Sequence, residues 1–189
     1  MIRFHFNSVK TTQAACYLLK RKGGTMSKGF LLKMLYLADR ELLQKRGQPI
    51  TGDRPVSMKN GPVLSKTYDL TKGGAVEHRA YWEKFITNAP SGYTDVSLIQ
   101  EAGTDYLSKI EIRVLDEVFD KFRNFSWRQL VDYCHKLPEW KNPGESSFAI
   151  DFEQILSGVG KSGEEISEIE NQADESRILD AILKNYAVA

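Results

Sequence analysis

The residues that most suggest chemistry lie near the C-terminal end, where residues 158–162 read Gly-Val-Gly-Lys-Ser, like the end of a phosphate-binding P-loop. A P-loop requires G-x-x-x-x-G-K-[ST] between a buried strand and a helix, because its first glycine lets backbone N–H groups surround the phosphates. The position of that glycine is occupied by Ile155, and the preceding FEQILSG is typical of a helix. We therefore predict no nucleotide cofactor. Instead, Gly158 ends one helix, and Ser162 with Glu165 caps the next.

The other reactive side chains form no catalytic or metal-binding pattern. His5, His78 and His135 are far apart and lack ligand spacing. Cys134 and His135 are adjacent in a helical pattern, where neighbours point about 100° apart and cannot face each other as nucleophile and base. Within residues 39–41, Asp-Arg-Glu, we expect helix-surface charges or an aspartate that holds a neighbouring loop. The sequence thus predicts a protein that is not an enzyme and has no catalytic residue, metal or cofactor.

Hydrophobic periodicity predicts that helices position these side chains. A first helix is expected from Ser8, its cap, to about residue 22, and a second, central one over residues 27–46. A short helix follows over residues 64–71. Two later helices begin with capping boxes, Ser108 with Glu111 and Ser126 with Gln129.

Alternation of apolar and polar residues predicts a small antiparallel sheet. Val56 and Met58 alternate with polar residues in a short strand that an Asn-Gly-Pro turn follows. Residues 81–86 and 93–99 are expected to form a β-hairpin. The predicted fold is mainly α with a small antiparallel β-sheet or hairpin, an α+β class. A compact helical core spans residues 1–143, and an acidic helical extension, residues 144–189, is expected to pack on it or flank it.

The charge is divided unevenly along the chain. Residues 1–72 hold 14 basic and four acidic residues, and residues 73–189 hold 12 and 21. Either the basic part faces nucleic acid or an acidic protein, or the two parts neutralise each other within the fold; we favour the second. The apolar runs are too short to span a membrane, and Cys16 and Cys134 lack metal-ligand spacing, so we expect a cytoplasmic protein.

One stretch, from Lys28 to Leu70, resembles a known family. It contains a K-x-L-Y-L-A-D helix, then P-I-T-G-D, a strand that ends in G-P-V, and a Y-D-L helix. These elements resemble the Panacea domain, also called the SocA-like antitoxin domain, which is associated with phages. Residues 126–140, SWRQLVDYCHKLPEW, resemble a later segment of that family, in which a tryptophan follows a helix that ends near a histidine. The resemblance covers roughly residues 8–170 and includes the 158–162 loop.

The resemblance implies an antitoxin that binds and neutralises a toxin encoded by an adjacent gene. Some members of the family act as adaptors that deliver the toxin to an ATP-dependent protease. The alternative that we keep is a nucleic-acid-binding regulator, which the basic first part would favour. Because this chain is too short to add a helix-turn-helix module outside the matched region, nucleic acid is the less favoured partner.

The motif residues divide into a structural set and a set of exposed candidates. We expect Asp39 to accept hydrogen bonds from a backbone turn or from His135, and Asp53 to hold its own turn closed. The structural set is Tyr36, Asp39, Asp53, Gly61, Pro62, His135 and Trp140. The exposed candidates for toxin contact are Arg40, Arg54, Lys59 and Tyr68, together with the acidic tail.

Overall fold

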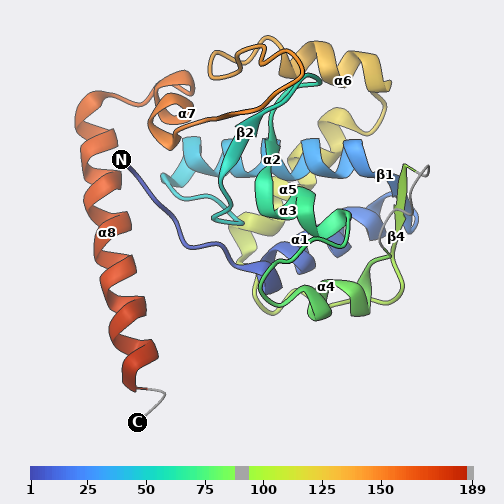
Figure 1. The fold of residues 1–189 in the computed structure, drawn as a ribbon, viewed down its shortest axis with the longest axis horizontal. Helices are drawn as coiled ribbons and strands as arrows, with labels where there is room; N and C mark the ends of the chain where they lie inside the picture. Colours follow the sequence, from blue (N-terminus) through green and yellow to red (C-terminus); the bar gives the residue numbers. More distant parts are fainter. Residues whose placement is uncertain (88–93, 187–189) are drawn as a thin grey trace.

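The helices of the protein surround one central helix (Figure 1). The structure is a computed structural model that describes residues 1–87 and 94–186. Its helices are α1 (Ser8–Arg21), α2 (Lys28–Arg46), α3 (Ser65–Thr71), α4 (Arg79–Phe85), α5 (Lys109–Phe122), α6 (Trp127–Cys134), α7 (Phe152–Gly158) and α8 (Gly163–Tyr186). Its strands are β1 (Thr25–Ser27), β2 (Pro55–Ser57), β3 (Val63–Leu64), β4 (Asp95–Ser97) and β5 (Phe148–Ala149). The predicted α+β class with small antiparallel sheets is confirmed.

Helix α2 forms the centre of the core because it is buried on nearly all sides. Eleven consecutive or nearly consecutive positions between Leu31 and Leu43 are buried. The helix contacts α1, α5, α6, α7 and strand β3. The polar side chains of its enclosed segment, Lys33, Tyr36 and Asp39, therefore lie inside the molecule, whereas those of its last turn, such as Gln44 and Lys45, are exposed.

Two small antiparallel sheets lie against the helices. In one, β1 pairs with β4, and Met26 lies opposite Val96. In the other, the strand order is β3-β2-β5, with Val56 opposite both Val63 and Ala149. The predicted strand at Val56 is therefore present, and its sheet joins the turn after β2 to the segment before α7.

The predicted hairpin over residues 81–99 is wrong in its first arm. Residues Arg79–Phe85 form α4, because Trp82 and Phe85 are three positions apart and both bury their rings on the same helix face. Strand β4 pairs with β1 instead, and the described parts of the two expected arms meet at the bridge between Ile86 and Leu98, where the Ile99 N–H also donates to the carbonyl of Phe85. Most of the predicted hairpin loop lies outside the described residues.

The helix ends follow the predicted capping chemistry with two corrections. Both capping boxes, at Ser108 and Ser126, are present. The cap of α1 is Asn7 rather than Ser8, because the Asn7 side chain accepts the bond from the Lys10 backbone N–H. Gly158 is the last residue of α7, as predicted, but its φ is not positive. The glycine in the left-handed conformation is Gly160, with φ 90°.

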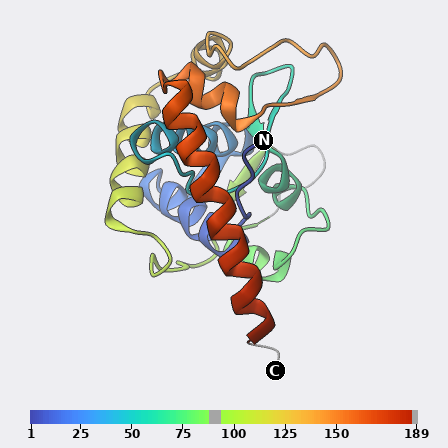
Figure 2. The same ribbon diagram turned by 90° about the vertical axis from the view of Figure 1, so that its left-hand side faces the viewer.

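The acidic C-terminal segment begins inside the core and ends outside it. Leu156 of α7 and Ile169 and Ala173 of α8 are buried in the same cluster as the central helix. The C-terminal end of α8 projects beyond the rest of the molecule (Figures 1 and 2). None of the described helices combines the length and the apolar character that crossing a lipid bilayer requires.

Candidate functional site

One face of α2 carries polar side chains that reach the segment after α6. The Tyr36 hydroxyl donates to Glu139 Oε1 at 2.7 Å, and Arg40 Nε donates to the same oxygen at 2.7 Å. The Glu139 side chain has no exposed surface, and that of Arg40 is only 16% exposed. The prediction that Arg40 is exposed is wrong, and its contact with the toxin stays a prediction. Its guanidinium neutralises a buried carboxylate instead.

A buried lysine holds the turn between β2 and β3. The Lys33 side chain is 1% exposed, and its ammonium donates to the carbonyl of Pro62 at 2.8 Å. Burial lowers the pKa of Lys33 to about 8. Gly61 adopts φ 97°, and a Cβ there would lie 2.8 Å from the Cβ of Cys134. The Gly-Pro turn is therefore packed between α2 and the end of α6, where a larger residue would not fit.

His135 and Trp140 hold the other side of the same turn. Their rings stack with centroids 3.9 Å apart and planes 14° from parallel. The Trp140 indole N–H donates to the carbonyl of Met58 at 3.0 Å, and His135 Nε2 lies 3.1 Å from the carbonyl of Lys59. The two rings thus fix successive backbone carbonyls of residues 58 and 59.

Two buried aspartates organise the segment between α2 and α3. Asp39 accepts from the backbone N–H groups of Ile50 at 2.9 Å and Thr51 at 3.0 Å, and from the Thr51 hydroxyl. Its partner is thus the backbone turn rather than His135. Burial raises the pKa of Asp39 to about 7, against the opposing effect of these hydrogen bonds.

The Asp53 carboxylate binds the start of α3 rather than its own turn. It accepts from the backbone N–H groups of Lys66 at 3.1 Å and Thr67 at 2.7 Å, in the first turn of α3. The residue at the cap position, Leu64, has no side-chain acceptor, so Asp53 supplies the missing cap from the preceding segment. Asp53 therefore caps a helix, whereas we expected it to close its own turn.

The remaining candidates for toxin contact differ in their exposure and in whether they already have a charged partner. Lys59 is exposed and forms an ion pair with Glu145. Tyr68 is half-buried rather than exposed as we predicted, because its ring packs against the cluster of Leu32, Val56 and Val63, and the ammonium of Lys72 lies 4.0 Å from its ring centre. Arg54 is exposed and, like Arg3, forms no ion pair within the described parts of the chain. These two arginines line a cavity of about 560 Å³, whose wall also includes Phe4 and Asp151.

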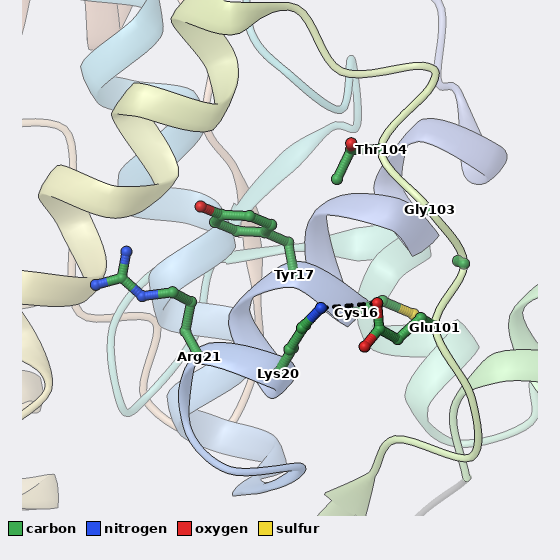
Figure 3. A pocket seen from close by; sticks show the side chains of 8 residues that line it. Cys16, Tyr17, Lys20, Arg21, Glu101, Gly103 and Thr104 are labelled. Atoms are coloured by element: carbon green, nitrogen blue, oxygen red, sulfur yellow. Dashed lines mark hydrogen bonds and ion pairs between the residues drawn. The ribbon is translucent and has the colours of Figure 1, made fainter.

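A second cavity, of about 500 Å³, lies between α1 and residues 101–104 (Figure 3). Lys20 and Glu101 form an ion pair of 2.8 Å across it, and the Tyr17 hydroxyl donates to Asp116 at 2.7 Å. Burial raises the pKa of the Cys16 thiol to about 12, so this cysteine is not an activated nucleophile. Sequence reasoning missed this cavity because residues 101–104 carry no motif.

The loop at residues 158–162 is a helix connection. It follows α7 rather than a strand, and Ser162 and Glu165 cap α8 through reciprocal bonds of 2.8 and 3.2 Å. Lys161, the residue that would contact a phosphate, donates to Glu165 at 2.8 Å. Nor do residues 1–87 and 94–186 bring together three side chains of the types that ligate metals.

Ion pairs connect the basic first part of the chain to the acidic later part. Lys10 pairs with Glu111, Arg21 with Asp116, and Lys45 with Glu117. Lys20, Arg40 and Lys59 likewise have acidic partners beyond residue 100. Six of the 14 basic residues of the first part are thus paired with the later part, so the described residues show the partial neutralisation that we favoured.

Two residues of this site, Lys33 and Glu139, were not singled out from the sequence. Lys33 is the only charged residue between Phe30 and Ala38, in a segment that is otherwise apolar or aromatic. Such a position predicts a buried ammonium that needs a partner. Glu139 has no comparable signal, because a glutamate after a proline is usually exposed.

The comparisons with known proteins agree with this arrangement of motifs. The family model described as "Antitoxin SocA-like, Panacea domain" matches residues 31–141. No curated protein and no solved structure matches the chain. The matched region begins in α2 and ends just after Trp140, so it contains the polar contacts around the β2–β3 turn. The chain therefore belongs to the SocA-like antitoxin family with a Panacea domain.

Proposed function

We propose that this protein is the antitoxin of a toxin–antitoxin pair and neutralises its toxin by direct binding. The observation that carries the proposal is the family match over residues 31–141. The toxin in this proposal is the product of the adjacent gene. The two cysteines are free and buried, which suits the reducing cytoplasm where we place the pair.

The contacts of the buried polar residues support a binding role over a catalytic one. Lys33, Asp39 and Glu139 are each engaged by hydrogen bonds within the fold. Buried polar groups that form hydrogen bonds within the fold make a scaffold rigid. Recognition of a partner then depends on the exposed surface. Rigid scaffolds lower the entropic cost of binding a partner.

Arg54 is the exposed motif residue that best suits a contact with the toxin. It and Arg3 line one cavity and lack ion-pair partners among the described residues, whereas Lys59 already has Glu145. An arginine beside an apolar wall can bind a carboxylate with two hydrogen bonds. We infer that Arg54 contacts an acidic group of the toxin.

The nucleic-acid alternative has less support than the charge distribution first suggested. Six of the 14 basic residues of the first part form ion pairs with acidic residues of the later part. Binding to phosphates depends on free Lys and Arg side chains, so this pairing weakens that function. Delivery of the toxin to an ATP-dependent protease remains compatible with direct binding, since an adaptor must also form a complex.

The test is growth rescue combined with co-purification. The adjacent open reading frame should arrest growth when expressed alone, and co-expression of this chain should restore growth through a direct complex. Arg54→Glu should weaken the complex roughly 10- to 100-fold, the range for losing a buried charged contact, and leave the melting temperature unchanged. Arg128→Glu, a reversal at an exposed arginine in the first turn of α6, is the matched control.

The outcomes separate the mechanisms. Rescue with faster disappearance of the toxin, lost in a protease-deficient host, would identify an adaptor. Rescue with stable toxin in a complex would identify a blocking antitoxin. If the neighbouring product is not toxic, or if rescue occurs with neither a complex nor toxin degradation, the antitoxin proposal fails.

A further inference from the structure

Helix α8 has an anchored half, residues 163–173, and a free half, residues 174–186. Its 24 residues span about 36 Å at 1.5 Å per residue. Ile169 packs against Gly47 at the end of α2, where a Cβ would lie 2.7 Å from Ile169 Cγ1, and Ala173 is 4% exposed. Every described side chain of α8 after Ala173 is exposed, and the C-terminal end of the helix projects beyond the rest of the molecule (Figures 1 and 2).

The free half carries a group of exposed apolar side chains, Ile178, Leu179 and Ile182, which we call the distal patch. Their exposed fractions are 61%, 60% and 46%. Three of the eight large apolar side chains that are exposed in the described parts of the chain thus lie within five positions. Such clustering marks an interaction surface, whereas single exposed apolar residues are ordinary.

The distal patch points away from the core. At about 100° per residue, Ile169 and Ala173 lie on one side of α8, and the centre of the distal patch lies roughly on the opposite side. The two apolar faces on one helix therefore serve different surfaces. Bending α8 towards the domain would bury the first face further and leave the distal patch in solvent.

The charge of α8 restricts what can cover the distal patch. Four of its seven acidic residues lie in the anchored half, and the free half carries three acidic and two basic residues. Asp174 and Glu175 precede Ile178 and Leu179 by three or four positions and so flank the distal patch, whereas Arg177 lies on the opposite side of the helix. This acidic edge repels the phosphates of nucleic acids and anionic lipid surfaces. A second copy of the helix would bring the same negative charge to the contact, which disfavours a symmetric helix pair.

We propose that the distal patch of α8 inserts into an apolar groove of the toxin whose rim carries lysine and arginine side chains. This inference rests on the proposed antitoxin function and assigns a surface to it. The recognition mode is that of an amphipathic helix in a groove, in which apolar side chains at i and i+4 are the anchors. The acidic residues beside the patch pair with the basic rim and add specificity and association rate.

The experiment compares full-length variants in binding to the purified product of the adjacent gene by calorimetry. The test variant is Ile178→Ala/Leu179→Ala/Ile182→Ala, which preserves helix propensity because alanine is the strongest helix former. The matched control is Ile99→Ala/Tyr106→Ala, which removes exposed apolar side chains elsewhere. We expect the test variant to bind roughly 10- to 100-fold more weakly and the control to bind as the wild type does. Both should match the wild type in far-UV circular dichroism and melting temperature.

Two further measurements on the wild-type chain identify the molecule that covers the distal patch. Amide exchange in residues 175–182 should slow when the toxin product is added, and the affinity should fall as salt concentration rises. If the test variant binds as tightly as the wild type, the distal-patch inference is overturned and the antitoxin function stands. If the wild type itself neither binds nor rescues, both fall. If sedimentation shows a wild-type dimer that the test variant loses while toxin binding is unchanged, the occupant is a second copy and the inference is likewise overturned.

Discussion

At the scale of single residues, buried charges determine where the connecting segments of this protein lie. Lys33, Asp39 and Asp53 each bind backbone groups of a segment that is distant in the sequence. A buried ion is costly unless its hydrogen bonds are complete, so each of these side chains strongly favours one path of the chain. Their role is thus to specify the positions of the β2–β3 turn and of residues 50–67.

The contacts of Asp39 predict a defined loss of stability. Asp39→Ala leaves the N–H groups of Ile50 and Thr51 buried without an acceptor, which should lower the free energy of unfolding by about 1–3 kcal/mol. Asp39→Asn retains an acceptor oxygen and should lose less. Urea unfolding of both variants measures the difference. An unchanged unfolding midpoint together with lost toxin binding would reassign Asp39 from scaffold to interface.

The lowered pKa of Lys33 predicts a pH dependence of stability. Between pH 8 and about 10.5 the unfolded state holds a proton on this amine that the folded state has released, so stability rises with pH in that window. The wild type should gain about 3 kcal/mol relative to Lys33→Met between pH 7.5 and 10.5, because burial lowers the pKa of the amine from 10.5 to about 8.

The comparison with Lys33→Met is necessary because other groups oppose the trend. Burial raises the pKa of Cys134 to about 11, which lowers stability as pH rises above 9, and the charge of Lys33 opposes that rise. Because the two groups are coupled, both proteins also carry Cys134→Ala, and urea unfolding at pH 7.5 and 10.5, with a thiol reductant present, then isolates the contribution of Lys33. A constant difference between the two proteins across this range would show that the Lys33 amine is not desolvated.

At the scale of elements, the end of α2 is where the C-terminal helix attaches. Gly47 ends α2 in a left-handed conformation, with φ 70°. Because the glycine has no Cβ, Ile169 of α8 approaches its backbone closely. One residue therefore serves both as the helix cap and as the docking point of another helix.

A double-mutant cycle tests this attachment. Gly47→Ala should destabilise the protein through both its backbone conformation, at about 1–2 kcal/mol, and the clash with Ile169. In the background of Ile169→Ala only the backbone cost should remain, so the two changes should couple by about 0.5–3 kcal/mol in urea unfolding. Simple additivity would mean that α8 does not dock on α2 in this way.

At the scale of the whole molecule, basic residues of the first part of the chain form ion pairs with acidic residues of the later part. The basic residues of α1 and α2 face the acidic residues of α5 and of the segment after α6. Most of these pairs are partly exposed, so each contributes little to stability, and their main effect is to cancel the field of the basic part. The free half of α8 lies outside this arrangement: Asp174 pairs with Arg177 within the helix, and the charge of the exposed Glu175 is available for a partner.

Local chemistry alone determined the helices at the centre of the protein, the two capping boxes, the short strand at Val56 and the rejection of the P-loop. Each of these depends on residues within a few positions of one another, such as Ser162 and Glu165. The family resemblance likewise depends on contiguous motifs. Short-range hydrogen bonds and helical periodicity are physical properties that a linear sequence displays directly.

Only the tertiary structure decided the pairing of β4 with β1, the burial of Arg40 and the partners of Lys33 and Glu139. Arg40 and Glu139 are 99 positions apart, and residues 81–86 are apolar enough for either a strand or a helix. Which alternative forms depends on the surface that each segment packs against, because burial free energy exceeds local propensity. The same holds for the distal patch of α8, whose apolar residues became an exposed surface only because the core meets the other side of that helix.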